Sequence, residues 1–230
     1  MRFLVISDLH GELQNLDKLD DEFRQADAVL FAGDFARFDH PETGKPALEA
    51  MCKKHELIYS VIGNCDEPSF LEEIEKKDIS VENTISYHEG LAFAGSGGGS
   101  KFNGSTPNER SEEELLADLS IVDKASAGAA DENGHWNNLI LIIHNPPKDT
   151  KCDQVAPGVH VGSQLLRKFI EERQPLAVIT GHIHEGISID KIGLSTVINP
   201  GPLADGCYAI LEVEKKDDSW TVTRAELKKV

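Results

Sequence analysis

The chain has 230 residues, of which 40% are hydrophobic and 27% charged, and its formal net charge is −17. This composition is ordinary for a globular protein with a substantial core. The acidic excess argues against a nucleic-acid surface, which would need clustered Lys and Arg. It does not exclude a small phosphorylated ligand, because acidic residues can hold cations that reverse the local sign of charge. Since no internal repeat or long linker divides the chain, we expect one domain over residues 1–230.

The cysteines and the N-terminus indicate in which cellular compartment the protein resides. The four cysteines are widely spaced and form no CxxC motif, so neither a disulfide framework nor a zinc knuckle is indicated. The apolar run at residues 3–6 is too short for a signal peptide or a membrane span. We therefore expect a cytoplasmic protein with no membrane partner, and an oligomer is compatible with the sequence.

The chain up to residue 180 alternates between expected strands and helices. Short runs rich in Val, Ile and Leu predict strands buried on both faces, at residues 2–6, 28–32, 57–62, 139–143 and 176–180. Helical spacing of apolar residues predicts helices over 12–24 and 163–173, the second ended by Pro175. Ser-x-x-Glu sequences at 69–72 and 111–114 predict capping boxes.

The C-terminal part has a different pattern. Residues 195–199, 207–213 and 220–225 alternate like half-exposed strands, and a polar turn predicts that the last two form a hairpin. The chain thus starts as β-α-β and ends rich in β, which indicates a mixed α/β fold.

The glycine-rich segment Gly95-Ser96-Gly97-Gly98-Gly99-Ser100-Lys101 follows an expected strand at 91–94. It lacks the glycine before lysine of a phosphate-binding P-loop and the third spaced glycine of a dinucleotide fingerprint. The favoured interpretation is a flexible surface loop. The alternative is a mobile flap near a site.

Each of the five most strand-like runs ends in residues that can bind metals. In order, these ends are Asp8-x-His10, Gly33-Asp34, Gly63-Asn64, His144 and Gly181-His182-x-His184. The carboxyl ends of parallel strands share one edge of a sheet, where ligands bind in open α/β folds. Residues i and i+2 of an extended chain point the same way, so each of the two i, i+2 pairs can reach one locus.

The donor set indicates which ions would bind. Taken singly, Asp-x-His is more often a capped turn, and Gly-Asp is usually only a turn. Together the ends supply two carboxylates, one amide oxygen and four imidazoles, too many for one tetrahedral zinc. Two divalent ions sharing a carboxylate suit this set. Mixed nitrogen and oxygen ligation without thiolate favours Mn, Fe, Zn or Co over Mg or Ca.

These motifs, in this order, resemble the metallophosphoesterase, or calcineurin-like phosphoesterase, superfamily. The stretches His160-Val161-Gly162-Ser163 and Asn199-Pro200-Gly201-Pro202 are similar to its Icc-related predicted phosphoesterases. The resemblance implies a four-layer αββα sandwich with two mixed sheets. It also implies that Asp8, His10 and His184 hold one metal, that Asn64, His144 and His182 hold the other, and that Asp34 bridges them. Manganese is the expected ion, with Fe, Zn, Co or Ni as alternatives.

The implied activity is hydrolysis of phosphoesters, with a phosphodiester as the favoured substrate. Two nearby cations can bind phosphoryl oxygens and generate a bridging hydroxide that attacks phosphorus. Many relatives have His after Gly-Asn, where this chain has Cys65. That His is thought to protonate the leaving group, so Cys65 and Asp66 are the candidates for this role, while Cys65 as a small buried spacer is the alternative. Asn64, Asn145 and His160 are candidate substrate contacts.

Other functions stay open at this level. A phosphomonoesterase would use the same centre. A non-catalytic scaffold on the same fold is a further alternative, although all seven ligand positions are intact. A metal-dependent amidohydrolase is disfavoured, because it needs an early His-x-His and a (β/α)₈ barrel.

Overall fold

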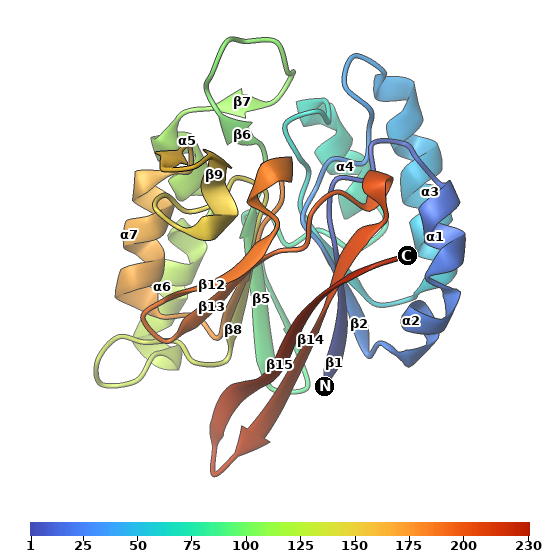
Figure 1. Cartoon of the computed structure of the whole chain (residues 1–230). Helices are drawn as coiled ribbons and strands as arrows, with labels where there is room; N and C mark the ends of the chain where they lie inside the picture. The colour runs from blue at the N-terminus through green and yellow to red at the C-terminus, as the bar shows by residue number, and fades with distance from the viewer.

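Four layers make up the molecule, with helices outside each of two facing β-sheets (Figure 1). The computed structural model describes residues 1–230, the side chain of Ala127 excepted. The predicted αββα sandwich with two mixed sheets is confirmed. Among the described residues, no helix has the length and apolar character needed to cross a membrane.

The first sheet carries the N- and C-terminal strands. In spatial order its strands are β15 (Ser219–Lys229), β14 (Cys207–Lys216), β1 (Arg2–Ile6), β2 (Ala28–Phe31) and β3 (Ile58–Ser60). β1, β2 and β3 run parallel, whereas β14 and β15 form the predicted antiparallel hairpin. The parallel strands are short and almost wholly buried, as continuous apolar runs require.

The second sheet has a parallel centre and antiparallel edges. In spatial order its strands are β12 (Ser188–Ile192), β13 (Ser195–Asn199), β11 (Ala177–Ile179), β8 (Leu139–Ile143), β5 (Leu91–Ser96) and β4 (Ile85–His88). Strand β13 was expected to be half exposed, but all five of its residues are buried because it lies inside the sheet. Two small ladders complete the strands: β6 (Gly99–Ser100) with β7 (Glu109–Arg110), and β9 (Gln154–Ala156) with β10 (Val159–His160).

The sheets face each other across a shared apolar core. The ring of Phe93 from the second sheet stacks on Tyr59 of the first, with centroids 3.8 Å apart, and meets Phe3 edge-on. Side chains on both outer faces pack against helices. The first sheet is covered by α1 (Gln14–Lys18), α2 (Asp20–Gln25), α3 (Gly44–Lys54) and α4 (Leu71–Glu75). The second is covered by α5 (Glu112–Ala117), α6 (Ser120–Ala129) and α7 (Gln164–Arg173).

Of three predictions about helices, the structure confirms one capping box and contradicts the other two. Ser111 forms the predicted capping box with Glu114. The capping box predicted at 69–72 is wrong, because that segment begins as a 3₁₀ turn, Pro68–Phe70, and α4 follows without a side-chain cap. The helix predicted over 12–24 is divided at Leu19, whose side chain is buried in the core.

The carboxyl ends of the two sheets meet at one edge of the sandwich. Backbone hydrogen bonds join the loops after β1 and β2, from Asp8 N to Gly33 O at 2.9 Å, and the ends of β8 and β11, from Gly181 N to His144 O at 3.1 Å. The amide of His182 reaches across to the Asp8 carboxylate of the other sheet at 3.2 Å. Loops from both sheets therefore surround a common space at this edge.

Candidate metal centre

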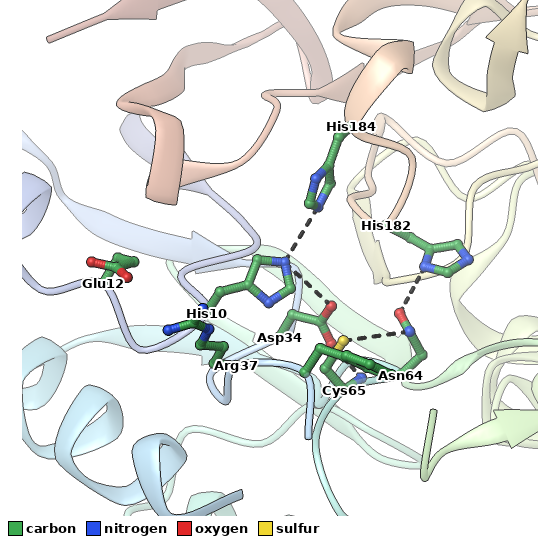
Figure 2. A pocket seen from close by; sticks show the side chains of 9 residues that line it. His10, Glu12, Asp34, Arg37, Asn64, Cys65, His182 and His184 are labelled. Carbon is green, nitrogen blue, oxygen red and sulfur yellow. Dashed lines mark hydrogen bonds and ion pairs between the residues drawn. The ribbon is translucent and has the colours of Figure 1, made fainter. Parts of the chain in front are cut away.

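Three of the seven residues predicted as ligands form the open half of the centre. His184 Nε2 lies 3.5 Å from Asp8 Oδ1, and His10 Nε2 lies 3.9 Å from the same oxygen. The two imidazole Nε2 atoms face each other at 3.3 Å (Figure 2). Metal-binding atoms of Asp8, His10 and His184 all lie within 4.8 Å of one another. One cation could contact all three.

Three others form the buried half. Asn64 Oδ1 lies 2.8 Å from His144 Nε2 and 2.7 Å from His182 Nδ1. His144 and Asn64 come from different sheets, so this half exists only in the folded protein. The Asn64 amide NH₂ points the other way, toward Cys65 Sγ at 3.6 Å (Figure 2).

Asp34 lies between the two halves. Its Oδ2 atom is 3.8 Å from His10 Nε2 in the open half and 3.5 Å from His144 Nε2 in the buried half. Its Oδ1 atom accepts a hydrogen bond from the Cys65 amide at 2.8 Å. A Cβ on Gly63 would overlap that Oδ1 atom, which explains why glycine precedes Asn64. Asp34 thus contacts the imidazole Nε2 atoms of one histidine in each half.

Backbone carbonyls orient two of the imidazoles. His144 Nδ1 lies 2.6 Å from the Ala32 carbonyl, and His10 Nδ1 lies 3.2 Å from the Ala36 carbonyl. A carbonyl only accepts, so each Nδ1 must donate its proton. In the neutral ring, each Nε2 then presents a lone pair to the centre, the arrangement usual for metal-bound histidine.

Left-handed backbone marks four of the seven residues. Asp8, His10, Asp34 and His182 have φ angles of 52°, 48°, 62° and 67°. Residues other than glycine rarely adopt this region, and such conformations persist where the surrounding structure imposes them, often at functional sites. The tight turns at the strand ends turn these side chains back into the common space.

Burial and close charges shift the pKa values of the centre. Burial raises the pKa of Asp8, but its hydrogen bond to His184 and the charges of the nearby histidines outweigh burial, so its pKa lies well below the usual range. Burial, reinforced by the charge of His144, lowers the pKa of His182 to about 4. Near neutral pH the centre thus combines an ionised carboxylate with a neutral imidazole, both ready to bind a cation.

The donor atoms fit divalent cations. His144 Nε2 and Asn64 Oδ1 are both acceptors while the ring is neutral, yet they lie 2.8 Å apart. Two acceptors at that distance repel unless a proton or a cation lies near both. Imidazole nitrogens with carboxylate and amide oxygens are the ligands of Mn, Fe, Zn and Co.

Asp66 has a different setting from that expected of a proton donor. Its side chain is fully buried, and its oxygens accept hydrogen bonds from the amides of Gly63, Asp34, Phe35 and Ala36 at 2.7–3.2 Å. It lines neither of the two cavities that open beside the centre. Burial and the charge of Asp34 raise the pKa of Asp66 to about 6. The carboxylate clamps the Asp34 loop to the Asn64 loop, and nothing shows it reaching a leaving group.

Cys65 lines the main cavity but is a poor acid. Its side chain is buried, with 8% of the residue exposed. Burial and the Asp34 carboxylate raise the pKa of the thiol well above its usual range. The thiol therefore stays protonated and gives up its proton with difficulty.

Two cavities open from the centre and share Asn64 and His182. The first, about 460 Å³, is also lined by Arg37, Phe38 and Cys65, together with His10, Glu12, Asp34 and His184 (Figure 2). The second, about 380 Å³, lies between residues 100–109 and residues 155–161 and also contacts Ile183. The two cavities have different walls in every other respect.

The glycine-rich segment belongs to the centre, so its interpretation as a flexible surface loop is wrong. Gly97, Gly98 and Gly99 are buried. A Cβ on Gly99 would lie 3.0 Å from Asn64 Cβ and 3.1 Å from His182 Cε1, tighter than most side-chain contacts. Glycine lets this backbone approach the buried half.

Asn145 and His160, predicted as substrate contacts, each bind a neighbouring segment of the chain. Asn145 is buried, and its Oδ1 accepts from the Ser100 amide at 2.9 Å. His160 Nδ1 lies 2.7 Å from the buried Asp153 carboxylate. Neither lines the two cavities, although each supports a segment that does.

Sequence reasoning missed the residues that shape the cavities. Arg37 and Phe38 follow the Asp34 strand end, and Phe102 follows the glycine-rich segment. The only available signal was their position just beyond a strand-end motif, within loops where specificity usually resides.

Comparisons with known proteins bear on the family and the fold. A family model described as calcineurin-like phosphoesterase matches residues 1–186. An uncharacterized protein from Methanocaldococcus jannaschii is 34% identical over 225 residues, which cover 94% of this chain and 93% of that protein.

Solved structures share the fold at low sequence identity. A crystal structure of a Thermus thermophilus protein has a TM-score of 0.71 at 19% identity, covering 99% of this chain and 98% of that one. A dimetal phosphatase from Danio rerio has a TM-score of 0.53 at 12% identity, covering 100% and 98% of the two chains.

Proposed function

Because the chain belongs to the calcineurin-like phosphoesterase family, and is thereby a metal-dependent phosphoesterase, we propose that it is a phosphodiesterase with two divalent cations. The observation that carries this proposal is the pair of cavities that share Asn64 and His182. A phosphodiester carries two organic groups on one phosphorus. Two cavities that meet beside the metal-binding side chains suit such a substrate, whereas a monoester needs only one.

In this proposal each half of the centre holds one cation. Asp8, His10 and His184 hold the first, Asn64, His144 and His182 hold the second, and Asp34 contacts both. When bound, two such cations neutralise phosphoryl charge and lower the pKa of the water that attacks phosphorus. We propose manganese as the ion; nitrogen and oxygen ligands without thiolate suit it, as they also suit Fe, Zn and Co.

The protein's own groups orient the ligands and the substrate. Ala32 and Ala36 carbonyls fix two imidazoles, and Asp66 fixes the loop that carries Asp34. Asn64 contributes an oxygen without adding negative charge, which keeps the site attractive to an anion in an acidic protein. Since Cys65 is a weak acid, the reaction suits leaving groups that depart without being protonated, such as aryl oxides.

A phosphomonoesterase is the second candidate, and Arg37 is the observation that favours it. The Arg37 guanidinium lines the first cavity, and no ion pair with a described residue engages it. A free cation beside the centre would stabilise the dianionic phosphate of a monoester more than the monoanion of a diester.

Hydrolysis of bis(4-nitrophenyl) phosphate and 4-nitrophenyl phosphate by the manganese-loaded protein tests the proposal. We expect kcat/KM for the diester to exceed that for the monoester by about tenfold or more, and EDTA to abolish both activities. A preference for the monoester would favour the second candidate. Bound metal without hydrolysis of either ester would indicate a scaffold.

A further inference from the structure

We propose that the second cavity binds the non-leaving ester group of the substrate and selects an aromatic ring there. We call this cavity the Phe102 groove; its apolar wall residues are Phe102, Val155, Val161 and Ile183, and it shares Asn64 and His182 with the first cavity. This inference rests on the phosphodiesterase activity proposed above.

Apolar side chains that are exposed to water gather along this groove. Phe102 is 89% exposed and Val161 is 41% exposed. Single exposed apolar residues are common on protein surfaces. Here, however, two of them border one cavity that begins at the side chains of Asn64 and His182. An aromatic ring held between them would cover both and could stack on Phe102.

The Phe102 side of the groove is held in place by polar contacts. The Glu109 carboxylate accepts hydrogen bonds from the amides of Phe102 at 2.7 Å and Gly104 at 3.0 Å. Asn108 donates from its backbone N–H to the backbone carbonyl of Asn64 at 3.1 Å, and from its side-chain NH₂ to the Gly63 carbonyl at 3.0 Å. The loop that carries Phe102 is thus tied to the loop that carries Asn64. A ligand stacking on Phe102 therefore spends little free energy on ordering the loop.

The opposite wall is fixed in the same way. Buried Asp153 accepts hydrogen bonds from the amides of Thr150 at 2.9 Å and Gly162 at 3.0 Å, and its Oδ1 lies 2.7 Å from His160 Nδ1. These contacts hold the β9–β10 hairpin, which presents Val155, and Val161 just after it. His160 therefore supports the groove without lining it.

The distribution of polar groups assigns the non-leaving group to this side. The first cavity is lined by Arg37, whose guanidinium can stabilise charge that develops on a leaving oxygen. The one cationic side chain of the Phe102 groove among the described residues is Lys101, and its Nζ lies 3.7 Å from the Glu114 carboxylate. A leaving oxygen would be better stabilised in the first cavity, which leaves the apolar groove for the group that stays on phosphorus.

Binding of two phosphonates to the manganese-loaded full-length protein tests the inference without turnover. Methyl phenylphosphonate and methyl methylphosphonate carry the same charge and differ in the carbon-linked group, which cannot leave. Calorimetry should show that the wild type binds the phenyl compound roughly tenfold more tightly, the size of effect known for aromatic stacking. Phe102→Ala should remove this preference, and Phe102→Trp should keep it.

A matched control and a kinetic comparison separate stacking from a general loss of function. Tyr87→Ala removes an aromatic side chain that is 66% exposed on the edge strand β4, outside both cavities, and should keep the phenyl preference. Bis(4-nitrophenyl) phosphate and methyl 4-nitrophenyl phosphate release the same leaving group. Phe102→Ala should lower kcat/KM roughly tenfold for bis(4-nitrophenyl) phosphate. For methyl 4-nitrophenyl phosphate it should change kcat/KM by less than about twofold.

Equal binding of the two phosphonates by the wild type, or an equal loss of both in Phe102→Ala, would overturn the inference. So would weak binding of both, since the groove would then not adjoin the phosphoryl position. If the phenyl preference depends on Phe102 but no ester is hydrolysed, the groove stands and the proposed function fails.

Discussion

The two halves of the metal centre differ in how far they are embedded in the fold. In the open half, the side chains of His184 and His10 are 44% and 17% exposed. In the buried half, the His144 side chain is inaccessible and Asn64 is 6% exposed. His10 and His184 can therefore serve as ligands alone, whereas His144 and Asn64 are also part of the packing between the sheets. Substitutions should separate these roles.

Loss of Asp34 should have the largest effect, because its carboxylate contacts histidines of both halves. We expect Asp34→Ala to lower kcat on bis(4-nitrophenyl) phosphate by at least about a thousandfold, since neither proposed cation would keep its shared ligand. Asp21→Ala, a change at an exposed carboxylate on α2, is the control and should leave kcat unchanged. Substantial activity in Asp34→Ala would show that the halves do not depend on a shared residue.

Loss of Asp66 should chiefly affect stability. Asp66→Ala leaves four buried amides without their acceptor, so we expect the free energy of unfolding to fall by about 3–5 kcal/mol in urea titrations. If Asp66 instead acted only as a proton donor, stability would hardly change while kcat fell.

Substitutions of the most buried and the most exposed of the four ligand histidines should separate effects on activity from effects on stability. His144→Ala and His184→Ala should both lower kcat strongly, although less than Asp34→Ala. We expect His144→Ala also to lower the free energy of unfolding by about 2–4 kcal/mol, because it removes a buried ring and leaves the Ala32 carbonyl unpaired. His184→Ala should cost less than about 1 kcal/mol. Equal destabilisation, measured by urea unfolding of the metal-free proteins, would contradict the distinction between the halves.

Replacing Cys65 should have the smallest effect. Cys65→His introduces a better general acid beside the first cavity, so turnover of diesters with alkyl leaving groups should rise by about tenfold or more. Turnover of 4-nitrophenyl esters should change only a few-fold. An inactive variant that still binds metal would argue that Cys65 is a spacer.

Much of this centre follows from strand geometry. Five apolar runs end in metal-binding residues, and the rule that parallel strands share a carboxyl edge predicts that Asp8, His144 and His182 lie near one another. The order of these short motifs also predicts the four-layer fold through family resemblance. Both arguments use residues within a few positions of a strand end.

The remaining features depend on contacts between distant segments. Asp66 sits in a polar turn, and only the folded chain shows that it accepts from amides 30–32 residues away. The glycine-rich segment has the composition of a flexible loop, and only the folded chain shows that Gly99 packs against Asn64 and His182. The walls of the Phe102 groove likewise join loops that lie about 50 residues apart. Such pairings follow from tertiary packing, which local patterns do not encode.

The central claim, that strand ends hold two cations around Asp34, is tested most directly by anomalous scattering from crystals grown with manganese. The account predicts two peaks per chain, about 3.5–4 Å apart, on either side of Asp34. One peak lies among Asp8, His10 and His184, and the other among Asn64, His144 and His182. A single peak, or manganese bound only elsewhere, would contradict it.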